Sequence, residues 1–260
     1  MVILVLQNNS KDTKKVIQEV MIPKIIHYCW FGGNPLPELA KECIASWCKY
    51  MPDWELKAWT EENFDIQAAP QYVQEAYAAK KYAFVSDYVR LWALERDGGL
   101  YMDVDFEVYK SFDDLMEQYD AFAGYEGSKR NPVMMGVIAA KAHHPWIQGM
   151  MQTYESRVFL KEDGSLDMTP NTGYFLNWMQ TRGFVADGVE KDFMGMHILP
   201  VECFCPGLTT GENLRCERTY CEHKGLHSWS GNGGWKSKLL NLVSPKVKAK
   251  IIKLKRRILG

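Results

Sequence analysis

The sequence predicts an α/β fold built on a largely parallel sheet. Short apolar runs of strand length alternate along the chain with longer segments whose apolar residues recur at helical spacing, and this alternation is typical of strands joined by helices. The chain has 260 residues, of which 47% are hydrophobic and 24% are charged. This composition is far from that of disordered chains, and the length suits one α/β domain with a sizeable core.

The first part of the chain supplies two strands and two helical segments. The apolar run 22–31 predicts a buried strand that ends at Gly32-Gly33. Residues 38–50 predict a helix, and residues 54–59 alternate as a second strand does. Thr60-Glu-Glu-Asn63 offers a cap and an acidic first turn for another helical piece. The apolar stripe of the first helix consists of Leu39, Cys43, Ile44 and Trp47.

Residues 83–96 predict the clearest helix, which Gly98-Gly99 ends. Over residues 100–108 the period changes to two, which predicts one strand. Its apolar face carries Leu100, Met102, Val104, Phe106 and Val108. Its other face carries Asp103, Asp105 and Glu107. Acidic side chains on one face repel one another unless a cation is bound there, so this face is a candidate site.

The second half has weaker patterns. Residues 119–140 predict further strand and loop, and residues 143–160 and 172–182 predict helices. Residues 195–235 are rich in Gly, Cys and His and are expected to be irregular. We divide the chain into three parts: an N-terminal extension (1–21), a main domain (22–235) and a basic tail (236–260).

Charge and cysteine content limit the function. A formal net charge of −1 argues against a nucleic-acid-binding protein, which usually has a basic surface. The sequence has no run of 18 apolar residues, so we expect no membrane-spanning segment. Seven cysteines, an odd number without a secretory signal, indicate the reduced thiols of a cytosolic protein. One stretch gathers Cys203, Cys205, Cys216, Cys221 and His223. A structural zinc site is one interpretation, but the paired ligand spacing is absent, so we prefer unpaired thiols.

Asp103 and Asp105 are the first candidate site residues. Two carboxylates separated by one residue on a polar face suit a hard divalent ion such as Mg²⁺ or Mn²⁺. Such an ion also binds a diphosphate and neutralises the charge that grows on it as a bond breaks.

Asp87 and Arg90 form a second candidate pair. They are three residues apart and therefore share a helix face. A surface ion pair would explain them, but Asp87 lies among apolar residues, where a charge needs a partner. A sugar hydroxyl for Asp87 and a phosphate or sugar for Arg90 would supply such partners.

Three ordered blocks resemble the family of glycosyltransferases that carry the DXD sugar-binding motif. They are 22–31 (IPKIIHYCWF), 83–94 (AFVSDYVRLWAL) and 98–105 (GGLYMDVD). The family includes yeast-type initiating mannosyltransferases and bacterial capsule and lipopolysaccharide enzymes, and the catalytic domains of large clostridial glucosylating toxins share this arrangement. The resemblance covers residues 22–110 closely and 120–235 loosely.

The resemblance implies that residues 22–235 form a GT-A catalytic domain, a Rossmann-like nucleotide-sugar-binding fold with a mixed, mostly parallel sheet. It also implies a nucleotide-sugar donor, Mn²⁺ or Mg²⁺, and retention of the anomeric configuration. Asp103 and Asp105 would contact the metal and diphosphate, and Asp87 and Arg90 the donor sugar and nucleotide. The base and ribose would be held by the loop after the first strand, through His27, Trp30 and Phe31.

Members of the family usually close the site with a His or carboxylate and a Trp near the C-terminus. His227, Trp229 and Trp235 are the matching residues, which makes His227 a candidate diphosphate or metal contact and the two tryptophans candidate nucleotide contacts. His223 also qualifies by position. Residues 169–173 (TPNTG) resemble the family's Thr-Gly-Pro turn in an altered order, and a helix-entry turn explains them equally well.

The tail 236–260 contains nine Lys or Arg residues and no Asp or Glu. A basic amphipathic helix of this kind suits an anionic membrane surface, and a solvated or core-docked terminal helix would show the same pattern. Its apolar residues at helical spacing are Val247, Ile251, Leu254 and Ile258.

We therefore predict a metal-dependent hexosyltransferase that moves a sugar from a UDP- or GDP-linked donor to a glycan or glycolipid acceptor in capsule- or lipopolysaccharide-type synthesis. We expect it in the cytoplasm, at the inner face of the cell membrane, without a nucleic-acid partner. A nucleotidyl- or phosphotransferase would use the same carboxylates, but it usually has a Gly-rich phosphate loop, for which Gly32-Gly33 is too little. A non-catalytic membrane-associated carbohydrate-binding module would not need the clustered acids.

Overall fold

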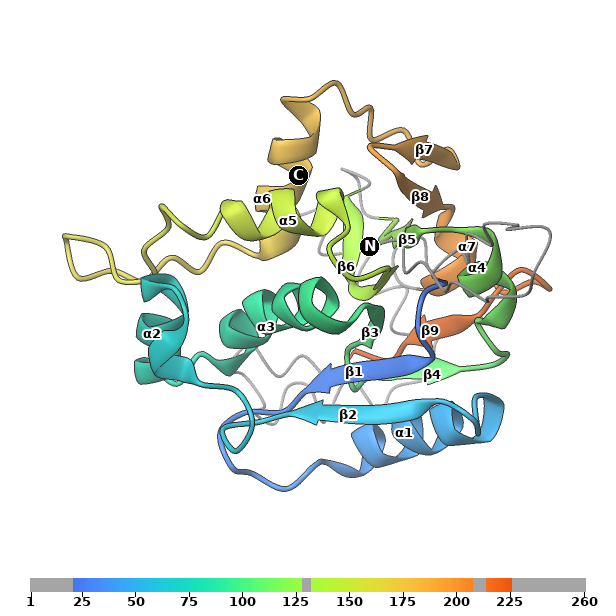
Figure 1. Cartoon of the computed structure of the whole chain (residues 1–260), viewed down its shortest axis with the longest axis horizontal. Helices are drawn as coiled ribbons and strands as arrows, with labels where there is room; N and C mark the ends of the chain where they lie inside the picture. The colour runs from blue at the N-terminus through green and yellow to red at the C-terminus, as the bar shows by residue number, and fades with distance from the viewer. Residues whose placement is uncertain (1–20, 128–131, 208–213, 226–260) are drawn as a thin grey trace, which may run out of the picture.

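The computed structural model describes residues 21–127, 132–207 and 214–225 and is built around a seven-stranded mixed sheet. Five strands run in one direction, and β6 and β7 run in the other. This arrangement confirms the predicted α/β class and the mixed, mostly parallel sheet. In order across the sheet, the strands are β2 (Glu55–Trp59), β1 (Ile25–Cys29), β3 (Gly99–Met102), β6 (Val133–Ala140), β5 (Ala121–Tyr125), β8 (Met196–Leu199) and β7 (Lys191–Phe193) (Figure 1).

Helices cover both faces of this sheet, and Figure 1 shows α1 and α3 on opposite sides of β1. The helices of the described residues are α1 (Glu38–Tyr50), α2 (Gln71–Ala78), α3 (Tyr82–Asp97), α4 (Asp113–Gln118), α5 (Pro145–Gln152), α6 (Asn171–Gln180) and α7 (Val201–Phe204), with a 3₁₀ turn at Ile66–Ala68. Sheet side chains alternate between the two faces. On β3, Tyr101 packs into the core beneath α2, α3, α5 and α6, whereas Leu100 and Met102 pack into the core beneath α1, α4 and α7.

The predictions from local patterns are confirmed for β1, α1, β2 and α3. The α3 helix ends where expected because Gly98 adopts a φ of 68°, which favours glycine, and its N–H donates to the Leu94 carbonyl at 2.9 Å. On α1, Cys43 and Trp47 are buried as the stripe predicted. The helix expected from residue 172 is α6.

The single strand expected over residues 100–108 is wrong. β3 ends at Met102, and residues 103–105 form a turn in which the Phe106 N–H donates to the Asp103 carbonyl. The chain then forms β4 (Phe106–Val108), which pairs antiparallel with β9 (Cys221–His223) in a separate two-stranded sheet. The two carboxylates therefore lie in a turn between two sheets and not on the face of one strand.

Three further expectations need correction. Thr60–Asn63 forms a turn, and the side chain of Asp65 caps the following 3₁₀ turn instead. The helix expected over 143–160 ends at Gln152. The segment 195–235, expected to be irregular, contains β8, α7 and β9.

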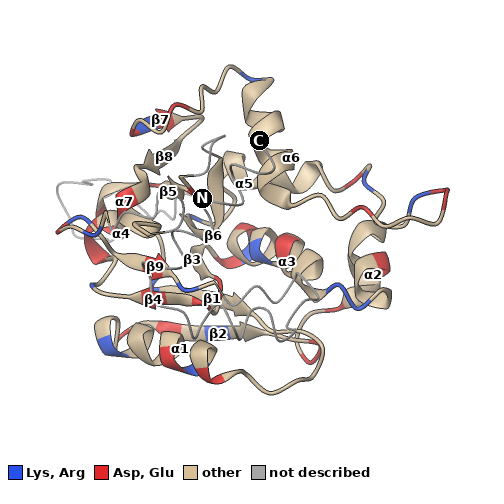
Figure 2. Cartoon of the chain, turned by 180° about the vertical axis from the view of Figure 1, so that it is seen from behind, with Lys and Arg blue, Asp and Glu red and all other residues tan. Residues whose placement is uncertain are grey.

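Charge is distributed over the described elements with both signs together, as Figure 2 shows for α1 and α3. In the parts of the chain that the structure describes, none of the helices is long and apolar enough to cross a membrane. The extension 1–21, except its last residue, and the whole tail 236–260 lie outside the described residues.

The topology places the ends of three strands together. β1 and β3 are parallel, and both β3 and β5 are antiparallel to β6, so the carboxyl ends of β1, β3 and β5 lie at one edge of the sheet. Ligands of open α/β sheets bind at such an edge.

Candidate functional site

A cavity of about 550 Å³ opens at this edge. Its walls come from the loop after β1, the first turns of α3, the turn after β3, the first residues of β6 and α6, and β9. Six of the residues proposed from sequence line this one cavity, namely Trp30, Phe31, Asp87, Arg90, Asp103 and Asp105.

Arg90 is the centre of the polar wall. It lies on α3 and is only 5% exposed. Its guanidinium reaches Asp87 Oδ1 at 3.0 Å and Asp103 Oδ1 at 3.3 Å, donates to the Met135 carbonyl, and stacks on the Tyr101 ring at 4.7 Å. Arg90 therefore ties α3 to β3 and β6 and fixes the position of the Asp103 carboxylate.

Burial changes the protonation of the two carboxylates beside Arg90. Desolvation raises the pKa of Asp87 to about 6, although the Arg90 charge acts in the opposite direction. Desolvation also raises the pKa of Asp103, which Arg90 again opposes and the nearby Asp105 charge reinforces. Added positive charge would stabilise the ionised forms of these groups.

Asp105 pairs with a histidine that comes from the far end of the described chain. The β4–β9 ladder places His223 opposite Phe106, and its Nε2 lies 3.1 Å from Asp105 Oδ2. Burial disfavours the imidazolium, but the hydrogen bond to Asp105 and the negative charges of Asp105, Asp103 and Glu126 together outweigh it and raise the pKa of His223 above its ordinary value. Of the two histidines weighed from sequence, the structure thus brings His223 to the carboxylates, whereas His227 lies outside the described residues.

The two carboxylates suit a hard divalent cation. Gly136 leaves space beside them, since a Cβ there would lie 2.8 Å from Asp103 Oδ2 and 2.7 Å from the Phe106 ring. Among the described residues, no group of three or more His, Cys, Asp or Glu side chains is arranged to hold a metal. Mg²⁺-type ions are commonly held by one or two carboxylates together with substrate phosphates and water, so Asp103 and Asp105 fit a cation that is shared with a diphosphate.

The loop after β1 forms the aromatic wall. Trp30 is partly exposed, and its indole N–H donates to the Asn34 carbonyl at 2.6 Å. Phe31 is 5% exposed and packs edge-on against Phe64. Trp30 therefore offers a surface on which a base can stack, whereas Phe31 mainly supports the loop.

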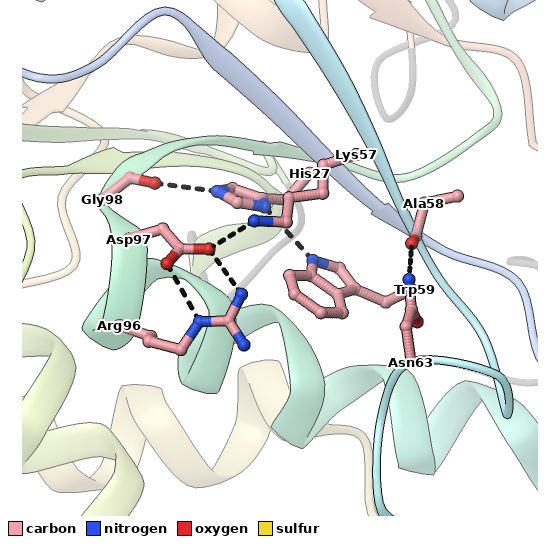
Figure 3. Close-up of polar contacts among 8 residues, drawn as sticks. All are labelled: His27, Lys57, Ala58, Trp59, Asn63, Arg96, Asp97 and Gly98. Carbon is pink, nitrogen blue, oxygen red and sulfur yellow. Dashed lines mark hydrogen bonds and ion pairs between the residues drawn. The ribbon is translucent and has the colours of Figure 1, made fainter.

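His27 differs from its predicted role as a base and ribose contact. Its side chain is fully buried and does not line the cavity. Nε2 bonds the Gly98 carbonyl at 2.8 Å, and Nδ1 accepts from the Trp59 indole at 3.1 Å (Figure 3). Both ring nitrogens are used, and burial lowers the pKa of His27. The side chain joins β1 and β2 to the end of α3 and has no room for a ligand.

The structure adds four polar residues to the cavity that the sequence did not single out, Asn34, Lys80, Lys81 and Glu126, and it also brings Asn171 and Thr172 there. Glu126 directly follows β5, just as Asp103 directly follows β3. Parallel strands end at the same edge of a sheet, so the strand order would have been enough to predict that Glu126 lies near Asp103. Asn171 lies in the segment 169–173, and it begins α6. Trp229 and Trp235, proposed as nucleotide contacts, lie outside the described residues.

The part of the chain that contains Asp87, Arg90, Asp103 and Asp105 is similar to known proteins. Residues 37–122 match the family described as "Glycosyltransferase sugar-binding region containing DXD motif", which confirms the resemblance drawn from the sequence blocks. The uncharacterized glycosyltransferase L373 of Acanthamoeba polyphaga mimivirus is 24% identical over 227 residues, which cover 81% of this chain and 84% of that protein.

Two further similarities are partial. Inositol phosphoceramide mannosyltransferase 3 of Schizosaccharomyces pombe is 31% identical over 102 residues, which cover 38% of this chain and 28% of that protein. Among solved structures, the PaToxG glycosyltransferase aligns with a TM-score of 0.44 and 19% identity, over 63% of this chain and 71% of that chain.

Proposed function

We propose that this chain transfers a sugar from a nucleotide-sugar donor to a glycan or glycolipid acceptor. The proposal starts from the match of residues 37–122 to the DXD-containing glycosyltransferase sugar-binding region. The observation that carries the proposal is the joint presence of Asp103, Asp105, the Asp87–Arg90 pair and Trp30 around one cavity. An aromatic surface for a base, a carboxylate pair for a cation and a partly buried acid for hydroxyls match the three parts of such a donor.

The residues of the cavity have separate roles in donor binding and transfer. Trp30 presents its ring to the base, and Asp87 accepts hydrogen bonds from donor hydroxyls. Arg90 holds Asp103 in place through its fixed planar fork. Asp103 and Asp105 would hold a Mn²⁺ or Mg²⁺ ion, which would neutralise charge on the departing nucleoside diphosphate.

Several finer points belong to the same proposal. We infer a GT-A enzyme with a UDP- or GDP-linked donor, retention of configuration with the acceptor hydroxyl attacking from the face that the diphosphate leaves, and a part in capsule- or lipopolysaccharide-type synthesis. The basic tail 236–260 would hold the enzyme at an anionic inner membrane surface. His227, Trp229 and Trp235 would close over the diphosphate.

The test is a panel of UDP- and GDP-sugars incubated with the purified chain and Mn²⁺. Mass spectrometry should detect free sugar and nucleoside diphosphate from at least one donor, and EDTA should suppress both. Release of pyrophosphate would instead indicate nucleotidyl transfer. Absence of turnover with every donor would contradict the proposal.

A further inference from the structure

Glu126 stands apart from the other acids of the cavity. It directly follows β5, and its N–H donates to the Pro132 carbonyl at 3.0 Å, which fixes the backbone at this edge of the sheet. Its side chain lines the same cavity as Asp105 and His223. The turn after β3 and the end of β5 thus bring their acids to one space from strands that are separated by β6.

The other carboxylates of the cavity are engaged. Asp87 and Asp103 share the Arg90 guanidinium, and Asp105 is bonded to His223. The partly buried side chain of Glu126 forms no hydrogen bond or ion pair with another of the described residues. Burial raises the pKa of Glu126, and His223 only partly opposes this. A partly desolvated carboxylate that faces a cavity without a partner is available to a substrate hydroxyl.

Other side chains near this end are less suited to receive a proton. His223 uses Nε2 on Asp105, and its Nδ1 is buried. Cys205 is fully buried and its thiol lies 3.2 Å from the Met134 sulfur, so these two residues provide an apolar wall. Such a wall beside one carboxylate suits a sugar ring that presents a carbon–hydrogen face and one hydroxyl.

We propose that Glu126 is the general base of the reaction and accepts the proton of the attacking hydroxyl. This inference rests on the proposed glycosyltransferase function. The hydroxyl oxygen forms a bond to the anomeric carbon, and the bond between that carbon and the diphosphate oxygen breaks. The electron pair of the broken bond leaves with the nucleoside diphosphate, and the hydroxyl proton passes to a carboxylate oxygen of Glu126 and then to solvent. Because a proton must leave on either face of the sugar, the assignment does not depend on the stereochemical outcome.

The test compares the wild-type chain with Glu126→Gln, which keeps the size of the side chain and removes the basic oxygen. The donor that the wild-type chain hydrolyses in the panel serves as substrate, with water as the attacking hydroxyl. General-base catalysis contributes about 100-fold or more, so kcat of Glu126→Gln should fall by about that factor. The affinity for UDP or GDP with Mn²⁺, measured by calorimetry, should stay within about twofold of wild type, because Glu126 acts on the attacking hydroxyl.

Two companion variants complete the design. Glu117→Gln removes an exposed glutamate of α4 and should leave turnover unchanged. Glu126→Asp keeps a carboxylate and should be more active than Glu126→Gln. Equal thermal midpoints for all variants establish that each is folded.

The outcomes separate the two proposals. If the wild-type chain turns over no donor, the proposed function fails and the role of Glu126 fails with it. If the wild-type chain is active and Glu126→Gln has the same kcat, only the base assignment is wrong. If Glu126→Gln loses nucleotide affinity in step with activity, Glu126 binds the nucleotide, and the assignment is likewise overturned.

Discussion

Two charge networks in this chain use the same components in different surroundings. The sheet network consists of His27, Lys57, Trp59, Arg96 and Asp97 (Figure 3). The cavity network consists of Asp87, Arg90, Tyr101, Asp103, Asp105 and His223. In each, an arginine of α3 bonds an aspartate and stacks on an aromatic ring, Arg96 on Trp59 and Arg90 on Tyr101, both at 4.7 Å.

The two networks differ in how their surroundings shift the pKa of their acids. Both oxygens of Asp97 are bonded, by Arg96 and by Lys57, and the Arg96 hydrogen bonds lower the pKa of Asp97 to about 2. In the cavity network Asp87 and Asp103 share the Arg90 guanidinium, Asp103 also accepts from the Tyr101 hydroxyl at 2.7 Å, and burial nevertheless raises the pKa of both acids. A satisfied network stabilises a fold, whereas a surplus of desolvated acid beside a cavity leaves binding capacity for a cation and a ligand.

The sharpest test of this difference is Asp103→Ala or Asp105→Ala. Because each removes one of two cation-binding carboxylates, turnover should fall by at least about 100-fold, whereas the free energy of unfolding should fall by at most about 1–3 kcal/mol, since relief of repulsion offsets part of the lost contact with Arg90 or His223. Donor turnover and urea unfolding measure the two effects. Either variant with normal turnover would show that the acid surplus has no catalytic role.

A matched pair of arginine substitutions compares the two networks directly. Arg90→Lys should lose about 10-fold to 100-fold in kcat/KM, since an ammonium group cannot reach Asp87, Asp103 and the Met135 carbonyl together. Arg96→Lys, the control on the same helix, should stay within about twofold. Similar losses in both variants would mean that α3 responds as a unit and that Arg90 has no special position.

His27→Ala tests the sheet network where it departs from the sequence prediction. It leaves the Trp59 indole and the Gly98 carbonyl without their partner and opens a cavity, so unfolding should become easier by about 2–4 kcal/mol. The KM for the donor should not change, because His27 does not line the cavity. A raised KM at unchanged stability would restore His27 as a nucleotide contact.

The smallest effect is expected from Asp97→Asn and depends on pH. The folded pKa of Asp97, about 2, lies below its unfolded value, so its stabilisation is present above about pH 4 and is lost as the pH falls through about 2. The wild type should therefore exceed Asp97→Asn by at most about 2 kcal/mol near neutral pH. Urea unfolding at pH 6 and at pH 3 should show this difference shrinking, and a constant difference would exclude the charged hydrogen bonds as its source.

Local patterns predicted the elements that local physics determines. The α3 helix with its glycine stop, and β1 and β2, follow from periodicity and from backbone freedom at Gly98. The break of the strand at Asp103 could not be predicted in this way, because the alternation continues through it and the β4–β9 pairing imposes the turn.

Residues placed by contacts between distant segments were left undecided, missed or misassigned for the same reason. His223 reaches Asp105 only through a three-residue strand, and Glu126 reaches the cavity only through the order of strands in the sheet. His27 lies in a block that resembles the family, yet its side chain faces Trp59 and Gly98, which no local pattern specifies.

The β4–β9 ladder also governs when the site can form. The turn at Asp103 and Asp105 leads into β4, and β4 pairs with β9, the last element that the structure describes. The turn is therefore not held in place until the segments between β4 and β9 have folded. Loop closure costs only about 0.6 kcal/mol for each doubling of loop length, so the final stability barely depends on this separation. Contacts between distant segments form late, however, and lower the folding rate. Binding of cation and nucleotide should therefore appear in the last phase of refolding, after the sheet and α3 have formed, and folding intermediates should lack transferase activity.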